Sequence, residues 1–121
     1  MIEPIVMLTL PWPPAVNNLF FSVGRRRVRS KRYDAWIAEA TAIVLQGRPG
    51  RVLGPFEAHL TFDRPDRRKR DLDGLCKAAL DLLVKLGVTE DDSLAQKITL
   101  EWSRRPIGKP GAAHIWIKGV S

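Results

Sequence analysis

The stretch from residue 64 to residue 93 constrains the fold most, because it passes from dense positive charge to an amphipathic pattern without a linker. Two carboxylates, Asp71 and Asp73, follow directly on a group of cations: Arg64, Arg67, Arg68, Lys69 and Arg70. Apolar residues then recur at three- and four-residue spacing, at Leu72, Leu75, Cys76, Ala79, Leu83 and Leu86. This spacing predicts a helix over residues 71–86, with one face on a core and Gly87 at its C-terminal end.

The segments around this helix carry strand patterns. Residues 5–10 are apolar on both alternating faces, which is typical of a strand covered on both sides. The proline-rich residues 11–18 must leave the sheet, and residues 19–29 are compatible with a short hairpin that turns near Gly24. Alternation with period two predicts further strands over three ranges: 56–63, 97–102 and 113–119.

A second helix is predicted to begin after the N-cap Ser30 and to run to about Gln46, with Gly47 and Pro49 as the stop. Its core-facing stripe comprises Tyr33, Trp36, Ile37, Ala40, Ile43 and Val44. The order of elements predicts an α/β fold with a mixed β-sheet and two main packed helices. A length of 121 residues suits a single domain spanning 1–121.

The charge of the chain indicates its partner. A net charge of +7 and a pI of about 10.2 favour a polyanion, with nucleic acid ahead of an acidic membrane. No apolar run approaches the roughly 18 residues that span a bilayer, so we expect no membrane partner. The N-terminus carries Glu3 and prolines where a signal peptide would carry basic and then apolar residues, so we expect a cytoplasmic protein. The single cysteine, Cys76, excludes an internal disulfide.

Asp71, Asp73 and Lys77 form the central candidate site. Side chains two residues apart in an ideal helix point about 200° away from each other, so Asp71 and Asp73 can converge only if Asp71 is a non-helical N-cap. Lys77 follows Asp73 by four residues and lies on the same helix face. The alternative interpretation is that Asp71 is a simple cap, Asp73 complements the helix dipole, and Asp73 forms a surface ion pair with Lys77.

Positive charge that can hold phosphate therefore lies beside negative charge that can hold a metal ion, which predicts a nuclease. A second acidic cluster follows the helix at Glu90, Asp91 and Asp92, but spacing alone does not bring it back to Asp71. A second basic run is expected to follow a phosphate backbone, or otherwise to be a solvated face: Arg25, Arg26, Arg27, Arg29, Lys31 and Arg32.

Two motifs together resemble the RusA family of Holliday junction resolvases, also called crossover junction endodeoxyribonucleases and often carried by prophages. The first is LPWPP followed by NN, and the second is PDRRKRDLDGLCKAALDLLVKLGVTEDD. The resemblance covers nearly the full length in order and spacing. The chain departs from the family at Gly74, where asparagine is common, and at Ala15 and Val16, which replace a polar residue before NN with one residue extra.

The resemblance implies a small magnesium-dependent homodimer that cuts four-way DNA junctions by paired, symmetric nicks. The family's essential aspartates fall on Asp71, Asp73 and Asp92, and its essential lysine falls on Lys77. The arginine before the first aspartate falls on Arg70, and Asp91 would support the site.

The chemistry expected at this site is hydrolysis by metal-activated water. Carboxylate ligands without thiols or imidazoles suit Mg²⁺, with Mn²⁺ as a substitute, and no nucleotide cofactor is expected. The cations expected to fix the DNA backbone are Arg67, Arg68, Lys69 and Arg70. Two alternatives remain at this point: a basic nucleic-acid-binding protein without catalysis, and a nuclease acting on branched DNA generally.

Overall fold

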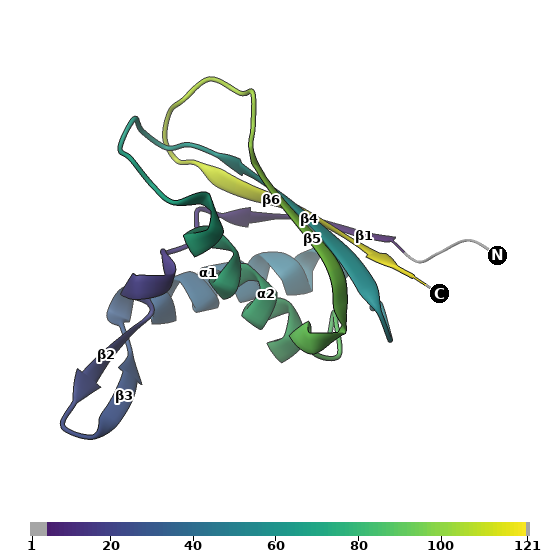
Figure 1. Ribbon diagram of the computed structural model, residues 1–121, viewed down its shortest axis with the longest axis horizontal. Helices are drawn as coiled ribbons and strands as arrows, with labels where there is room; N and C mark the ends of the chain where they lie inside the picture. Colours follow the sequence, from purple (N-terminus) through teal and green to yellow (C-terminus); the bar gives the residue numbers. More distant parts are fainter. Residues whose placement is uncertain (1–4, 121) are drawn as a thin grey trace.

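A mixed four-stranded sheet organises the chain in a computed structural model that describes residues 5–120 (Figure 1). The strand order is β1-β6-β4-β5. The strands are β1 (Ile5–Pro11), β4 (Phe56–Asp63), β5 (Ala95–Trp102) and β6 (Ala112–Gly119). β4 and β5 are parallel, whereas β6 is antiparallel to both β1 and β4. The predicted α/β class with a mixed sheet is therefore confirmed.

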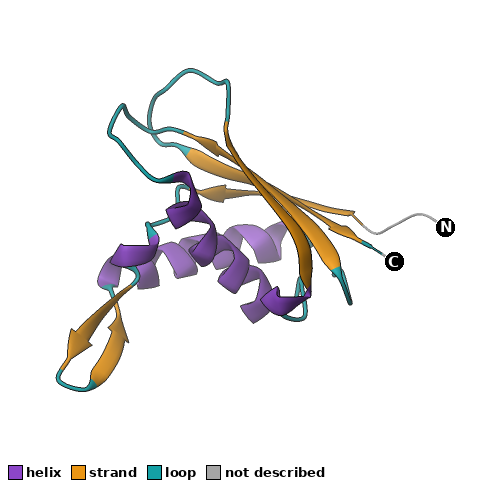
Figure 2. Ribbon diagram, in the orientation of Figure 1, coloured by secondary structure: helices purple, strands orange, loops and turns teal. Residues whose placement is uncertain are grey.

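Two helices cover one face of this sheet (Figure 2). They are α1 (Lys31–Gly47) and α2 (Cys76–Lys85), and three short 3-10 helices accompany them: η1 (Val16–Asn18), η2 (Leu72–Leu75) and η3 (Asp92–Leu94). Ser30 caps α1 as predicted, because its Oγ accepts a hydrogen bond of 3.1 Å from the backbone N–H of Tyr33. Gly87 follows α2 with a φ of 76°, the left-handed conformation expected of a glycine at a helix end.

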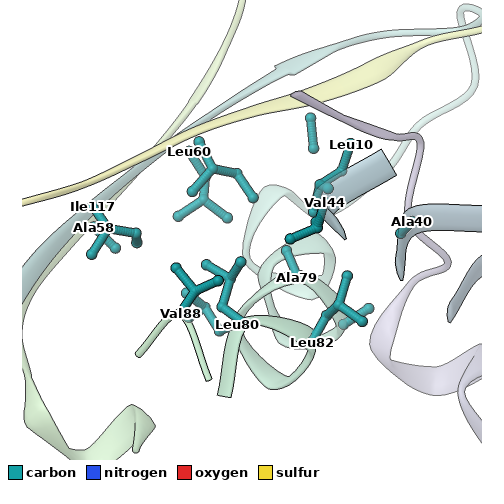
Figure 3. Close-up of a cluster of buried hydrophobic side chains, with 14 of the residues drawn as sticks. Leu10, Ala40, Val44, Ala58, Leu60, Ala79, Leu80, Leu82, Val88 and Ile117 are labelled. Carbon is teal, nitrogen blue, oxygen red and sulfur yellow. The ribbon is translucent and has the colours of Figure 1, made fainter. Parts of the chain in front are cut away.

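The core lies between the sheet and the two helices (Figure 3). Alternate residues of β4 are buried, namely Phe56, Ala58, Leu60 and Phe62, as their period-two pattern predicted. They meet α2, whose buried residues include Ala79, Leu82 and Leu83. This packing fixes α2, and therefore the charged segment before it, against the sheet.

Three predictions about packing were wrong. β1 is buried on one face only, with Ile5 58% and Met7 76% exposed, because no layer covers the outer face of the sheet in the described residues. Ile43 is 40% exposed on α1, so the buried stripe of that helix is narrower than predicted. The helix predicted over 71–86 begins as the 3-10 helix η2 and also buries residues outside the predicted stripe: Ala78, Leu80 and Leu82.

The predicted hairpin is present as a separate two-stranded ribbon, β2 (Phe20–Val23) and β3 (Arg26–Arg29). Its turn contains Gly24 with a φ of 61°, so the expected position of the turn is confirmed. The ribbon extends away from the body of the molecule beyond the N-terminal end of α1 (Figure 1). Within residues 5–120, no helix has the length and apolar character needed to cross a membrane.

Candidate active site

Asp71 precedes η2 with an extended backbone, at φ −85° and ψ 122°. The prediction that Asp71 is not yet helical is therefore confirmed. Its carboxylate makes no capping hydrogen bond, so the interpretation of Asp71 as a simple cap is wrong. Asp73 lies in the first turn of η2, and both aspartates are solvent-exposed. The carboxylates of Asp71 and Asp73 are therefore not used to stabilise the local backbone.

Asp71, Asp73 and Asp92 share a property that most other aspartates in the described chain lack. Within residues 5–120, none of these three carboxylates accepts a hydrogen bond or joins an ion pair, whereas Asp34, Asp63, Asp66 and Asp81 are each paired with a basic side chain. Unpaired oxygen ligands of this kind fit a hard divalent cation such as Mg²⁺. The donor chemistry therefore matches the ion that the sequence predicted.

Within residues 5–120 of a single chain, however, no three carboxylate, imidazole or thiol side chains come close enough together to hold a metal ion. The three aspartates are therefore presented separately by two short segments, the start of η2 and the start of η3. Asp91, the neighbour of Asp92, accepts a hydrogen bond from the Ser93 hydroxyl. The assignment of all three aspartates as ligands of one ion stays a prediction.

The second acidic cluster follows α2 and leads into η3. After Gly87 the chain runs back beside α2, so that η3 contacts α2 and the following strand β5 contacts η2. The negative charge of Asp92 is one of the influences that raise the pKa of Lys77. The parallel pairing of β4 with β5 sets the position of η3, which precedes β5, and the convergence of Asp92 with Asp71 and Asp73 stays a prediction.

Lys77 is held by Asp81, one helical turn further along α2. The Lys77 Nζ lies 3.2 Å from Asp81 Oδ1, and no ion pair joins Lys77 to Asp73 among the described residues. The hydrogen bond to Asp81 is the largest cause that raises the pKa of Lys77, followed by the charge of Asp81. Asp81 was missed at first, although its spacing of four residues from Lys77 was visible in the sequence.

The same pair lies close to α1. Burial raises the pKa of the Tyr33 hydroxyl, and the negative charge of Asp81 raises it further, while the positive charge of Lys77 opposes both. Tyr33 also contributes to the raised pKa of Lys77. The charges of Asp81 and Asp92 and the Tyr33 hydroxyl thus all raise the pKa of Lys77.

Arg70 is held in place rather than free in solvent. Its guanidinium donates two hydrogen bonds to Asp66, at 2.7 Å to Oδ1 and 3.0 Å to Oδ2, and its side chain is only 20% exposed. These bonds are the largest cause that lowers the pKa of Asp66 far below its ordinary value. The guanidinium also lies 5.2 Å from the ring centroid of Trp12, which stacks on Trp102. Asp66 and Trp12 were not predicted as site residues, and both hold Arg70 in place.

A cleft of about 440 Å³ opens beside Asp71. Its polar lining comes from three parts of the chain: Asn17 and Asn18 of η1, Arg32 of α1, and Arg68, Lys69, Arg70 and Asp71 before η2. The two asparagines are the NN of the first motif, but no spacing in the sequence links them to Asp71. An adjoining hollow of about 340 Å³ is lined by Arg64, Lys69, Arg70 and Asp71. A carboxylate and several cations thus share one concave surface.

The remaining predicted cations lie around this cleft or on the hairpin. Arg67, Arg68 and Lys69 are exposed before Asp71. Arg29 pairs with Asp34 at 2.9 Å, so its charge is partly compensated. The other cations of the second basic run are exposed, with Arg32 at the cleft: Arg25, Arg26, Arg27, Lys31 and Arg32. The binding of these cations to DNA stays a prediction.

A family model and several known proteins similar to this chain all point to the same family. A family model described as "Endodeoxyribonuclease RusA" matches residues 11–117. The chain is 36% identical over 112 residues to "Crossover junction endodeoxyribonuclease RusA" of Shigella sonnei, with 91% of each chain covered. It is 35% identical over 112 residues to the protein of the same name from Escherichia coli, and 33% identical over 113 residues to the one from Enterobacteria phage 82, again with 91% of each chain covered.

Proposed function

Because this chain belongs to the RusA family of endodeoxyribonucleases, we propose that it resolves four-way DNA junctions by paired, symmetric nicks. The similar proteins from Shigella sonnei, Escherichia coli and phage 82 are named as crossover junction endodeoxyribonucleases. The observation that carries the proposal is the cleft that combines Asp71 with cations from two separated segments. Each reaction hydrolyses one phosphodiester bond and leaves a nick in one strand.

The family implies a divalent metal ion, and we assign Mg²⁺, with Mn²⁺ as a substitute. The residues that hold it in this proposal are Asp71, Asp73 and Asp92, whose carboxylates make no other bond in the described chain. Three exposed carboxylates repel one another when drawn together, so they converge only when a cation compensates their charge. When bound, Mg²⁺ supplies a Lewis acid for the phosphoryl oxygen and lowers the pKa of a bound water.

Lys77 and Arg70 stabilise negative charge that develops on the phosphate. Asp81 favours the protonated state of Lys77 and restricts its side chain, so the ammonium group is ready to donate a hydrogen bond to a phosphate or leaving oxygen. Arg70 is already oriented by Asp66 and Trp12, which reduces the entropy lost when it binds a phosphate oxygen. Asp91 supports the start of η3 through Ser93.

The exposed cations fix the DNA backbone around the cleft. Arg67, Arg68 and Lys69 on one side and Arg32 on the other contact phosphates. Such contacts carry little sequence information, so selection of a substrate depends mainly on the shape of the junction. Resolving a two-fold symmetric junction requires two related nicks, and an isologous homodimer supplies two sites with the same symmetry.

Purified protein incubated with four-way, three-way and linear DNA, with and without Mg²⁺, tests this function. We expect magnesium-dependent nicks in opposite strands of the four-way junction, while linear DNA stays intact. Asp71→Asn and Asp73→Asn are expected to abolish cutting and retain junction binding. Glu39→Gln, a charge-neutralising change on the exposed face of α1, serves as the matched control and should cut normally.

Three outcomes would separate the alternatives. Salt-sensitive binding without any magnesium-dependent product would indicate a basic binding protein without catalysis. Equal cutting of three-way and four-way DNA would indicate a nuclease for branched DNA generally. Retained cutting by Asp71→Asn or Asp73→Asn would remove the proposed role of that residue.

A further inference from the structure

The hairpin formed by β2 and β3 has two chemically different faces. The antiparallel register pairs Phe20 with Arg29 and Ser22 with Arg27 on one face. The same register pairs Phe21 with Val28 and Val23 with Arg26 on the other face. Directly opposed residues share a side of the ribbon, so the first face is polar apart from Phe20, and the second is apolar apart from Arg26.

The first face contacts α1 at the base of the ribbon, whereas Ser22 and Arg27 farther along it are exposed. The ring of Phe20 packs edge-on against Tyr33 of α1, with 5.7 Å between centroids, and the Arg27 guanidinium lies 4.3 Å from the Phe20 centroid. Arg29 reaches Asp34 of α1 at 2.9 Å. These contacts orient the ribbon at its base, and its second face takes part in none of them.

The second face presents large apolar side chains without cover. Phe21 is 50% exposed and Val23 is 48% exposed, while Val28 of β3, the partner of Phe21, is half-buried. Arg25 and Arg26 stand at the tip of the ribbon, and neither makes an ion pair in the described residues. An exposed aromatic surface bordered by free cations is an unusual combination for a solvated hairpin.

The base of the hairpin is joined directly to the cleft that contains Asp71. The backbone N–H of Ser30 donates to the Leu19 carbonyl at 2.9 Å, and the Ser30 hydroxyl donates to the Asn18 carbonyl at 2.7 Å. Asn18 lines the cleft, as does Arg32 in the first turn of α1. DNA with its backbone in the cleft therefore lies beside the root of the ribbon.

The positive charges around the apolar face favour a nucleic acid over a second copy of the chain as the partner of this face. A second copy of the chain would bring another pair of hairpin arginines against Arg25 and Arg26, and this like-charge contact is unfavourable. A nucleic acid supplies the opposite charge through its phosphates. In the groove of a regular duplex, Phe21 would meet mainly polar base edges, whereas an unstacked base offers it an apolar face.

We propose that the Phe21–Val23 face of this hairpin stacks on bases that open at the branch point of the DNA junction, and so selects branched over linear DNA. This inference rests on the proposed function, because the cleft positions the junction beside the hairpin. Two strands of four residues reach about 13 Å, which is enough to enter the opening between two DNA arms. Arg25 and Arg26 bind the phosphates on either side, while Phe21 provides the stacking surface.

A four-way junction carrying 2-aminopurine at the branch point tests the proposal in EDTA, where no cutting occurs. We expect the unchanged protein to raise the fluorescence of this base as it loses its stacked neighbours. Phe21→Ala should remove the rise and weaken junction binding by about tenfold or more, with duplex affinity unchanged. Phe21→Trp keeps an aromatic surface and should keep the rise. Leu45→Ala, at a site 61% exposed near the far end of α1, is the matched control and should behave as the unchanged protein.

Three results would overturn the proposal. The first is a fluorescence rise in Phe21→Ala equal to that of the unchanged protein, and the second is an equal loss of junction and duplex affinity in this variant. The third is a dimer that sedimentation shows to dissociate into monomers when Phe21 is replaced by alanine, because the face would then be an interface between copies. Failure of the proposed function is distinguishable from failure of this inference. A fluorescence rise with no cutting in Mg²⁺ would refute the nuclease activity and support base stacking.

Discussion

Asp81 Oδ1 lies 3.2 Å from the Nζ of Lys77, four residues earlier on the same helix. This contact restrains the lysine side chain, and the hydrogen bond and charge of Asp81 are the two largest causes that raise the pKa of Lys77. We therefore propose that Asp81 is a positioning residue for Lys77.

Asp81→Asn is expected to lower the pKa of Lys77, because both the hydrogen bond and the charge that raise it are weakened. Turnover should fall by roughly tenfold while junction affinity stays within about twofold, since the ammonium group is less well oriented. A ¹³C NMR titration of Lys77 Cε measures the pKa, and single-turnover cleavage measures the rate. An unchanged Lys77 pKa together with unchanged turnover would contradict the positioning role.

Asp66→Asn is expected to change the acid stability of the protein. Arg70 holds the pKa of Asp66 well below its ordinary value, so the stabilisation is present above the unfolded-state pKa of about 3.9 and is lost as pH falls through the folded-state pKa. The melting temperature of the unchanged protein should therefore drop more steeply below about pH 4 than that of Asp66→Asn. If the melting temperatures of the unchanged protein and of Asp66→Asn fell equally between neutral pH and strong acid, the proposed contribution of Asp66 would be contradicted.

Gly111, in the loop before β6, packs against the segment that follows β4, and Gly24 of the hairpin turn serves as its matched control. Gly111 has a φ of 75°, and an added Cβ would lie 3.0 Å from the Asp63 carbonyl oxygen and 3.0 Å from Pro65 Cβ. Gly24 has a φ of 61° but no atom within 4 Å of an added Cβ. We expect Gly24→Ala to cost about 1 kcal/mol from backbone strain alone, and Gly111→Ala to cost about 1–3 kcal/mol more through overpacking. Urea denaturation compares the two, and equal costs would argue against close packing at Gly111.

Local patterns predicted most of the fold because the forces involved act over a few residues. The cap at Ser30, the turn at Gly24 and the alternating burial of β4 each follow from short-range sterics and periodicity. The strand β1 was predicted with two covered faces because its apolar run is compatible with either one or two layers. Whether a second layer exists depends on how many helices the whole chain supplies, and both α1 and α2 pack on the same side.

The candidate site was only partly predictable for a related reason. Asp73 and Lys77 are four residues apart, so helical geometry predicts that they share a face, and the N-cap position predicted for Asp71 allows its carboxylate to lie near them. Asn17, Asn18 and Arg32 line the same cleft through tertiary packing, which no spacing in the chain reveals. Asp66 and Trp12 support Arg70 across two loops, whereas Asp81 could have been found from its spacing to Lys77.

Single-turnover cleavage of a pre-bound four-way junction by Asp92→Asn, started by adding Mg²⁺, tests the central claim most directly, because Asp92 is the carboxylate contributed by a separate segment. The account predicts that Asp92→Asn binds the junction at least as tightly as the unchanged protein and makes no nick at any Mg²⁺ concentration. Cutting at the unchanged rate would show that a cation in this cleft does not require Asp92, and would contradict the account.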